Sequence, residues 1–162
     1  MIDTRDEEIL SIIQEEGRIS NADVARRVGM APSAVHGRLR KLEARGVIQG
    51  YEALVDPKAV GRDLTAFTFV SVEEQVGSTA IGEALTAVPG VLEVHYTAGQ
   101  DNYLVKLRVG GTEGLKEVLG RFGAVPGVRD TKTTIVLSTL KESRKLPLNG
   151  AAASSSKENG HE

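Results

Sequence analysis

The sequence contains no cysteine, which excludes disulfide bonds, thiolate nucleophiles and cysteine-based zinc sites. It also lacks a long hydrophobic run, since no apolar stretch approaches the ~18 residues of a membrane helix. The acidic N-terminus, MIDTRDEEIL, is unlike a signal peptide. We therefore expect a cytoplasmic protein without a membrane partner, and 162 residues suffice for one ordinary domain or two small ones.

Catalytic chemistry has little support. The three histidines, His36, His95 and His161, show no spacing typical of a metal site or a catalytic triad. The sequence has no P-loop, no dinucleotide-binding glycine motif after a strand and no carboxylate pair with an evident role. We expect no enzyme activity, no metal site and no cofactor.

Positive charge is concentrated in one short segment, although the whole chain has a formal net charge of −2. Such a concentration is typical of a nucleic-acid-binding surface, and a solvated helix face is the alternative. We expect double-stranded DNA as the partner. The candidate DNA-binding residues are Arg26, Arg27, Ser33, Ala34, His36, Gly37, Arg38, Arg40, Lys41 and Arg45.

The pattern in this segment predicts a helix-turn-helix. Ser20 can cap a first helix, which Gly29 ends, and Pro32 is well placed to begin a second. The inward side of the second helix recurs at helical spacing as Val35, Leu39 and Leu42. Small Ala25 and Gly29 allow the two helices to cross closely.

The outward side of the second helix carries Ser33, Gly37, Arg40 and Lys41, which would face the major groove. Arginine can form two hydrogen bonds to guanine, whereas lysine mostly neutralises phosphate. Gly37 costs the helix roughly 1 kcal/mol relative to alanine. It either permits close approach of the backbone to DNA or is a tolerated surface glycine.

The flanking segments complete this domain. An amphipathic first helix precedes the pair, and its acidic side should point away from DNA; that side consists of Asp6, Glu7, Glu8, Glu15 and Glu16. Gly46 should end the second helix. Val47 and Ile48 are expected to begin a short strand, and residues 51–55 are expected to form the strand of a wing.

The second half contains an internal repeat, because AVPGV occurs at residues 87–91 and again at 124–128. Each copy ends a helix pattern whose expected inward residues are Ile81, Ala84, Leu85 and Val88 in the first and Leu115, Val118, Leu119 and Phe122 in the second. Strands are predicted at residues 64–72 and 103–109 and again from residues 91 and 128. The resulting order β-α-β-β-α-β predicts a ferredoxin-like domain.

The run RISNADVARRVGMAPSAVHGRLRKLEARGVIQGYEALVDPKAVG resembles the N-terminal domain of the Lrp/AsnC family, the feast/famine transcription regulators of bacteria and archaea. The resemblance extends over about residues 2 to 148. It implies an α+β protein with an N-terminal winged helix-turn-helix and a C-terminal ferredoxin-like βαββαβ domain. It also implies that the second domain binds a small effector and assembles dimers, which join into octamers.

The expected domains follow from these patterns. Residues 1–50 form the winged helix-turn-helix, and residues 51–63 form the wing strand and linker. Residues 64–141 form the ferredoxin-like domain for effector binding and oligomerisation. Residues 142–162 form a tail that we expect to be flexible from about residue 149, where the sequence is small, polar and without an apolar stripe.

The hairpin between two predicted strands of the second domain is the candidate effector site. A glycine followed by polar residues can offer backbone N–H groups to a carboxylate, and Asp101 or Asn102 can receive an amino group. This chemistry would suit an α-amino acid, and a simple polar turn is the alternative. The candidate residues are Gly99, Gln100, Asp101, Asn102, Tyr103, Thr133 and Thr134.

Three functions remain open from these observations. The chain could be an effector-responsive transcription regulator, an effector-independent architectural DNA-binding protein, or a small-molecule sensor that acts through another protein. The basic helix disfavours the sensor. Only the polar hairpin separates the regulator from the architectural protein.

Overall fold

A computed structural model describes residues 2–148 of the chain, so the expected flexibility from residue 149 onward lies outside the described residues. Two units are present. The N-terminal unit consists of residues 2–54 together with 142–148, and the C-terminal unit consists of residues 55–141.

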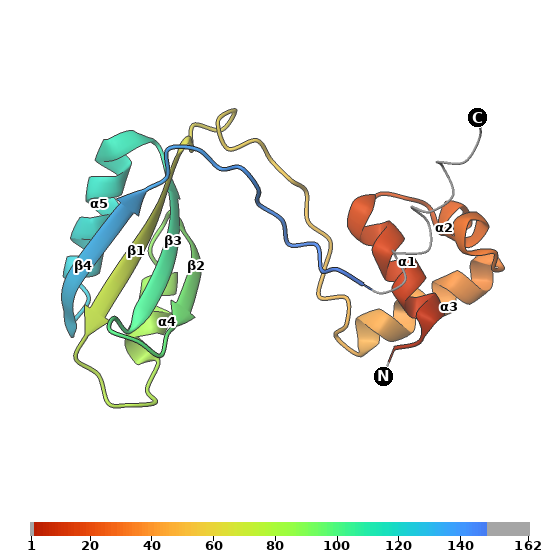
Figure 1. Cartoon of the computed structure of the whole chain (residues 1–162), viewed down its shortest axis with the longest axis horizontal. Coiled ribbons are helices and arrows are strands. Elements are labelled where there is room, and N and C mark those ends of the chain that lie inside the picture. Colours follow the sequence, from red (N-terminus) through yellow and green to blue (C-terminus); the bar gives the residue numbers. More distant parts are fainter. Residues whose placement is uncertain (1, 149–162) are drawn as a thin grey trace, which may run out of the picture. The chain divides into compact units, whose positions relative to one another are not determined.

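Three helices form the N-terminal unit (Figure 1): α1 (Thr4–Glu15), α2 (Asn21–Val28) and α3 (Pro32–Ala44). The Ser20 side chain caps α2 by accepting the backbone N–H of Asp23 at 3.1 Å. Gly29 ends α2 in the left-handed conformation, with φ of 66°, which favours glycine. The turn signals of the sequence are therefore confirmed, and they produce the predicted helix pair.

The core of the N-terminal unit lies where the three helices meet. Its buried residues are Ile9, Val24, Ala25, Val28, Val35 and Leu39. Asp6 on α1 is also buried, unlike the exposed Glu15 and Glu16 at the other end of that helix. Asp6 thus differs from the other acidic residues of α1, because its carboxylate has a basic partner, Arg38, on α3.

The expected strands after α3 are absent from residues 45–63 of the described chain. Gly46 does end α3, with φ of 68°. The N–H groups of Val47 and Ile48 then both donate to the Leu42 carbonyl, at 2.9 and 3.2 Å, so these residues complete the helix end. The prediction of a strand at 47–48 and at 51–55 was wrong in this chain, because an extended segment becomes a strand only when a second strand accepts and donates its backbone hydrogen bonds.

Residues 142–148 return to the N-terminal unit and pack on its surface. Arg144 pairs with Glu52 at 2.8 Å, and Lys145 pairs with Glu15 at 2.6 Å. The Leu146 N–H donates to the side-chain oxygen of Gln14 at 2.7 Å. Two separate segments of the chain therefore build this unit.

The C-terminal unit is a four-stranded antiparallel sheet with two helices on one side (Figure 1). Its elements are β1 (Leu64–Val72), α4 (Ala80–Thr86), β2 (Val91–Tyr96), β3 (Tyr103–Val109), α5 (Gly111–Gly123) and β4 (Val128–Ile135). The strand order in the sheet is β2-β3-β1-β4. The predicted β-α-β-β-α-β sequence and the ferredoxin-like fold are confirmed.

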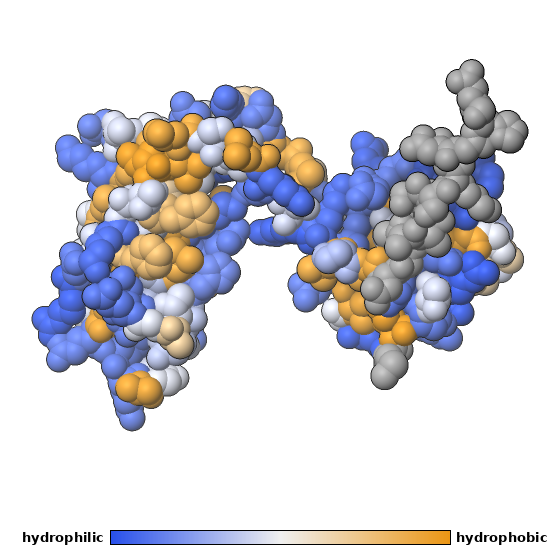
Figure 2. Space-filling model, viewed as in Figure 1, coloured by the Kyte–Doolittle hydropathy of each residue, from blue (hydrophilic) through white to orange (hydrophobic). Residues whose placement is uncertain are grey.

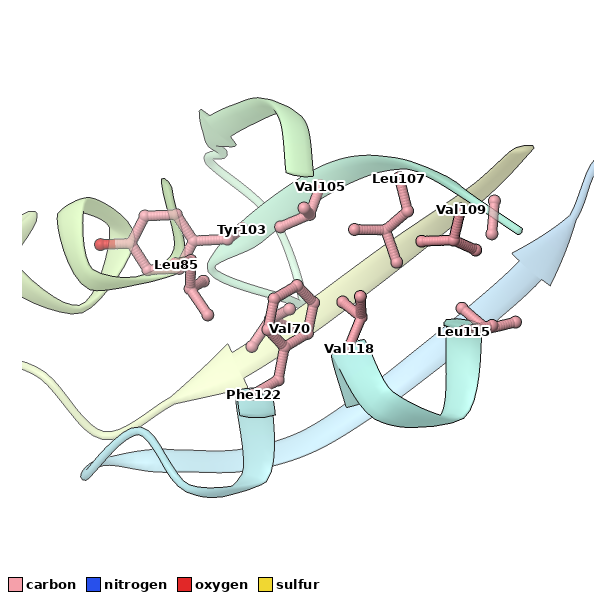
Figure 3. Packing of buried hydrophobic residues seen from close by; sticks show 10 residues of the cluster. Val70, Leu85, Tyr103, Val105, Leu107, Val109, Leu115, Val118 and Phe122 are labelled. Atoms are coloured by element: carbon pink, nitrogen blue, oxygen red, sulfur yellow. The ribbon is translucent and has the colours of Figure 1, made fainter. Parts of the chain in front are cut away.

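Alternating residues of the two central strands face the helices and form the core of this unit (Figure 3). On β3 these are Tyr103, Val105, Leu107 and Val109, and on α5 they are Leu115, Val118 and Phe122, as the helix pattern predicted. On α4, Leu85 is buried as expected, but Ala84 is exposed, and Gly82 is buried in its place. The expected inward position of Ala84 was therefore wrong.

The side chain of Tyr103 explains this rotation of α4. Its ring lies directly against Gly82, where an added Cβ atom would be 2.4 Å from the tyrosine Cε1. Its hydroxyl donates to Glu74 at 2.8 Å, and burial together with this bond raises the pKa of Tyr103 to about 12. The same Glu74 carboxylate accepts the Ile81 N–H at 3.0 Å near the start of α4. Tyr103 thus fixes α4 onto the sheet.

This packing predicts opposite effects for two glycine substitutions. Gly82→Ala should destabilise the protein by ~1–3 kcal/mol, because the new methyl group overlaps a buried ring. Gly120→Ala on α5 should instead stabilise it by ~0.5–1 kcal/mol, because its Cβ would meet no atom within 4 Å and alanine favours helix. Urea unfolding of both variants measures the difference. Equal stability of the two variants would contradict the proposed contact.

Candidate nucleic-acid interface and effector site

The outward side of α3 presents the residues expected to meet DNA. Ser33, Ala34, His36, Arg40 and Lys41 are exposed. The helix begins at Pro32, and its N-cap residue Ala31 supplies no side-chain cap. Backbone N–H groups at such an exposed helix start are suited to an anionic acceptor.

Gly37 lies within this surface, and its presence has no explanation in the packing of the chain. A Cβ atom at this position would meet no other atom within 4 Å. The fold would therefore accept alanine, which favours helix by roughly 1 kcal/mol. Gly37 also lines a hollow of about 470 Å³ beside the start of α1, together with Asp3, Asp6, Ala34, Arg38, Lys41, Leu42 and Arg45.

The structure divides the basic residues into two groups. Arg40 and Lys41 are exposed and have no acidic partner within ion-pair distance among residues 2–148. Three others are engaged within the chain: Arg26 with Asp23, Arg27 with Glu16, and Arg38 with both Asp3 and Asp6. Exposed ion pairs such as the first two are weak and can open when a phosphate approaches.

Arg38 differs from these surface pairs. Its Nη1 atom donates to Asp3 Oδ2 and to Asp6 Oδ1, both at 2.7 Å. The hydrogen bond from Arg38 is the main cause that lowers the pKa of Asp3 below its ordinary value. The stabilisation from this carboxylate is therefore present above its unfolded pKa of about 3.9 and is lost as pH falls through the lower, folded value.

The remaining candidates lie at the edges of this surface. His36 Nδ1 is 3.3 Å from the side-chain nitrogen of Asn21 at the start of α2. Arg45 is the C-cap residue of α3. The surface formed by α3 thus extends from Ser33 to Arg45.

In the C-terminal unit, the hairpin between β2 and β3 is tied to the neighbouring strands by its last two residues. Asp101 Oδ1 accepts the Ser71 hydroxyl at 2.6 Å and the Lys132 ammonium at 3.2 Å. The Asn102 side-chain oxygen accepts the Val72 N–H at 2.9 Å. Gly99 and Gln100, in contrast, are exposed at the tip.

These contacts give Asp101 a structural role that the sequence did not indicate. Its side chain is only 13% exposed. The Ser71 hydrogen bond is the main cause that lowers the pKa of Asp101, and Lys132 adds to the effect. Both bonds go to Oδ1. Ser71 and Lys132 could not be predicted, since each lies at least 30 residues away in the sequence.

The other expected effector residues do not gather at this hairpin. Tyr103 is in the core, where its hydroxyl is bound to Glu74. Thr133 faces the helices and lies 2.9 Å from Thr68, whereas Thr134 is exposed and, as the next residue of the strand, points to the opposite side of the sheet. The structure therefore does not support one site that contains all seven residues.

Comparison with known families now bears on both units. A family model described as Lrp/AsnC ligand binding domain matches residues 65–146, and a model described as winged helix-turn-helix DNA-binding matches residues 2–49. The chain belongs to the Lrp/AsnC family. As in that family, it is a DNA-binding transcription regulator with a C-terminal ligand-binding domain. The sequence resemblance is confirmed, and the architectural alternative is not favoured.

Individual relatives agree with this assignment. The chain is 36% identical over 147 residues to the HTH-type transcriptional regulator FL11 of Pyrococcus horikoshii, covering 91% of this chain and 97% of that protein. It is 35% identical over 150 residues to the leucine-responsive regulatory protein of Escherichia coli, covering 90% of each. These relatives are transcription regulators, in agreement with the expectation that the chain is not an enzyme.

Solved structures of similar proteins agree with this assignment. A transcriptional regulator of Neisseria meningitidis in complex with L-methionine has a TM-score of 0.85 and 30% identity, covering 93% of this chain and 99% of that chain. A feast or famine regulatory protein of M. tuberculosis, also complexed with L-methionine, has a TM-score of 0.83 and 32% identity, covering 90% and 99%. Within residues 2–148, no helix of our chain is long and apolar enough to cross a membrane.

Proposed function

We propose that this regulator uses three sites. Helix α3 reads the major groove of DNA, the open face of the sheet joins two copies of the chain, and the β2–β3 hairpin binds an α-amino acid. The observation that carries the proposal is the outward side of α3, where Arg40 and Lys41 stand exposed without an acidic partner among the described residues. The protein would act on DNA in the cytoplasm.

The DNA contacts follow from the position of each residue on α3. Ser33, Gly37 and Arg40 lie opposite the buried Val35 and Leu39, so they point directly away from the core. An arginine there can reach the edge of guanine. Lys41 lies further round the helix and is suited to a phosphate, as are Arg26 and Arg27 once their surface ion pairs open.

The sheet face opposite the helices supports self-association. Phe69 on β1 points to this face, and its neighbours across the strands are Leu104 and Lys132. Phe69 is 40% exposed in the single chain. Figure 2 shows apolar residues gathered over the strands on the side away from α4 and α5. A sheet with one buried face and one partly apolar face can gain stability by packing against a second copy.

A dimer would also suit DNA recognition. One helix-turn-helix covers only a half-site, and two-fold dimers place their recognition helices about 34 Å apart. The DNA sites should therefore be imperfect palindromes. The family resemblance implies that dimers join further into octamers.

The hairpin tip has the chemistry for an α-amino acid. Exposed backbone at Gly99 and Gln100 can bind the carboxylate, and Asp101 Oδ2 can accept the ammonium group. Methionine is the first ligand to test, because two structures similar to this chain contain it.

Substitutions on α3 should separate base reading from phosphate binding. We expect Arg40→Ala to cost ~1–3 kcal/mol on a specific site and to relax sequence preference. Lys41→Ala should weaken binding to all DNA alike. It should also reduce the magnitude of the salt slope, which is the slope of log affinity against log salt concentration, by about one. Lys116→Ala, which removes an exposed cation from α5, is the control. Fluorescence anisotropy with specific and random duplexes measures all three. Equal, sequence-independent losses for Arg40→Ala and Lys41→Ala would contradict base reading by Arg40.

Self-association predicts a change of mass on substitution at the open face. The parent protein should be a dimer or larger in light scattering at micromolar concentration. Phe69→Lys should dissociate it, because a charge would then be buried without a partner. Val76→Lys, at a residue that is 95% exposed in a loop, should leave the mass unchanged. A parent protein that is monomeric would overturn this part of the proposal.

Calorimetry tests the effector site. The DNA-competent protein should show saturable binding of L-methionine or another amino acid. DNA should change the affinity for the amino acid by the same factor by which the amino acid changes the affinity for DNA, which corresponds to a coupling free energy of about 1–3 kcal/mol. Gly99→Val and Asp101→Asn should weaken ligand binding. Lys132→Met should retain it, since this control removes one of the two partners of Asp101 but keeps the carboxylate and its bond to Ser71. If none of the twenty amino acids binds at millimolar concentration, the hairpin assignment fails and the architectural function regains support.

A further inference from the structure

Arg38 lies on the helix that reads DNA, yet its guanidinium group is held by the first turn of α1. Of the four carboxylate oxygens of Asp3 and Asp6, two accept backbone N–H groups of α1 and two accept Arg38. Asp3 Oδ1 accepts the Asp6 N–H at 2.8 Å, and Asp6 Oδ2 accepts the Asp3 N–H at 3.3 Å. The remaining two oxygens, Asp3 Oδ2 and Asp6 Oδ1, both accept Arg38 Nη1 at 2.7 Å. One pair of carboxylates therefore caps α1 and anchors α3.

Burial makes this anchor unlike an ordinary surface ion pair. The side chains of Asp6 and Arg38 are 12% and 31% exposed, whereas the side chain of Asp3 is 56% exposed, so the partly buried pair is Asp6 and Arg38. Two neighbouring carboxylates at the start of a helix repel each other, and the helix dipole offsets only part of this repulsion. If Arg38 left to bind a phosphate, the partly buried Asp6 would lose its charged partner, which is costly. The geometry therefore favours a permanent contact within the chain.

The anchor also determines how α3 is rotated about its own axis. Val35 is fully buried in the core and fixes one line along the helix. Arg38, three residues later, fixes a second line about 60° away, at 100° per residue. The buried Leu39 and Leu42 lie on the same side as Val35 and add apolar contacts, which are not directional. Arg38 adds directional bonds at the edge of this side, so they restrict how far α3 can turn and where Ser33, Gly37 and Arg40 point.

We propose that Arg38 is a positioning residue, which sets the orientation of α3 for DNA through its bonds to Asp3 and Asp6 and makes no DNA contact of its own. This inference rests on the proposed role of α3 in DNA binding. It removes Arg38 from the contact residues expected from the sequence.

The two possible roles of Arg38 predict opposite results for the acidic partner. If Arg38 were a phosphate contact, Asp6→Asn would free it and would remove a negative charge near DNA, so affinity would rise. If Arg38 is a positioning residue, Asp6→Asn loosens α3 and affinity falls. Glu7→Gln on the same helix is the matched control, because it removes one negative charge without touching the anchor.

The experiment measures DNA affinity against salt concentration for Asp6→Asn, Arg38→Lys, Arg38→Gln and the Asp6→Asn/Arg38→Lys double variant. Binding is measured well below the melting temperature of the least stable variant, so that a loss of global stability alone does not alter the result. We expect each single variant to lose roughly tenfold in affinity for a specific site, which corresponds to ~1.4 kcal/mol. The double variant should lose no more than a single one, because both disrupt the same contact.

Salt dependence and charge conservation decide between the two roles. Arg38→Gln should keep the parent's salt slope, whereas loss of a phosphate contact would reduce the slope by about one. Arg38→Lys keeps the charge but cannot reproduce the arginine geometry, and it should not restore affinity. Arg40→Lys, at an exposed residue without such an anchor, is the control for arginine-to-lysine exchange.

Three outcomes would overturn the inference while leaving the proposed function intact. These are tighter DNA binding by Asp6→Asn, a lower salt slope for Arg38→Gln, and parent-like affinity for Arg38→Lys. Failure of the parent protein to bind any DNA would instead overturn the proposed function, and the inference with it.

Discussion

Burial of one side of every element is the constraint on which this protein depends. On α3, Val35 and Leu39 pack into the core, and the opposite side remains available for a partner. On the central strands, residues that alternate along the chain face the helices, and those between them form an open face with Phe69. The hydrophobic effect thus creates the surfaces used for binding, because every side that is packed leaves another side exposed.

Most of the fold could be predicted because its signals are local. Ser20, Gly29 and Pro32 act on their own backbone or on residues a few positions away, and the structure has them in the expected roles. The wing strand at residues 51–55 and the side of α4 that is buried could not be predicted, because both depend on distant partners. Within residues 2–148, no strand lies beside the expected wing strand. On α4, Gly82 is buried where Ala84 was expected, because the ring of Tyr103 lies against Gly82.

The functional sites follow the same division. The sequence indicated the outward side of α3 from helical periodicity alone, but it treated all basic residues there as equivalent. Arg38 differs because its two partners lie 32 and 35 positions earlier in the chain. At the hairpin, Asp101 was predicted as a ligand residue from its type, whereas its bonds to Ser71 and Lys132 depend on how β1 and β4 are placed in the sheet.

The return of residues 142–148 to the N-terminal unit has a topological consequence. The C-terminal unit is inserted between two segments of the DNA-binding unit, so two lengths of backbone join the units. Residues 142–148 thus belong to the DNA-binding unit although they follow the whole of the ligand-binding unit in the sequence. The second attachment is held by exposed ion pairs of Arg144 and Lys145, which are weak individually and sensitive to salt. Higher ionic strength would thus weaken this attachment, and the hydrogen bonds between Leu146 and Gln14 would remain.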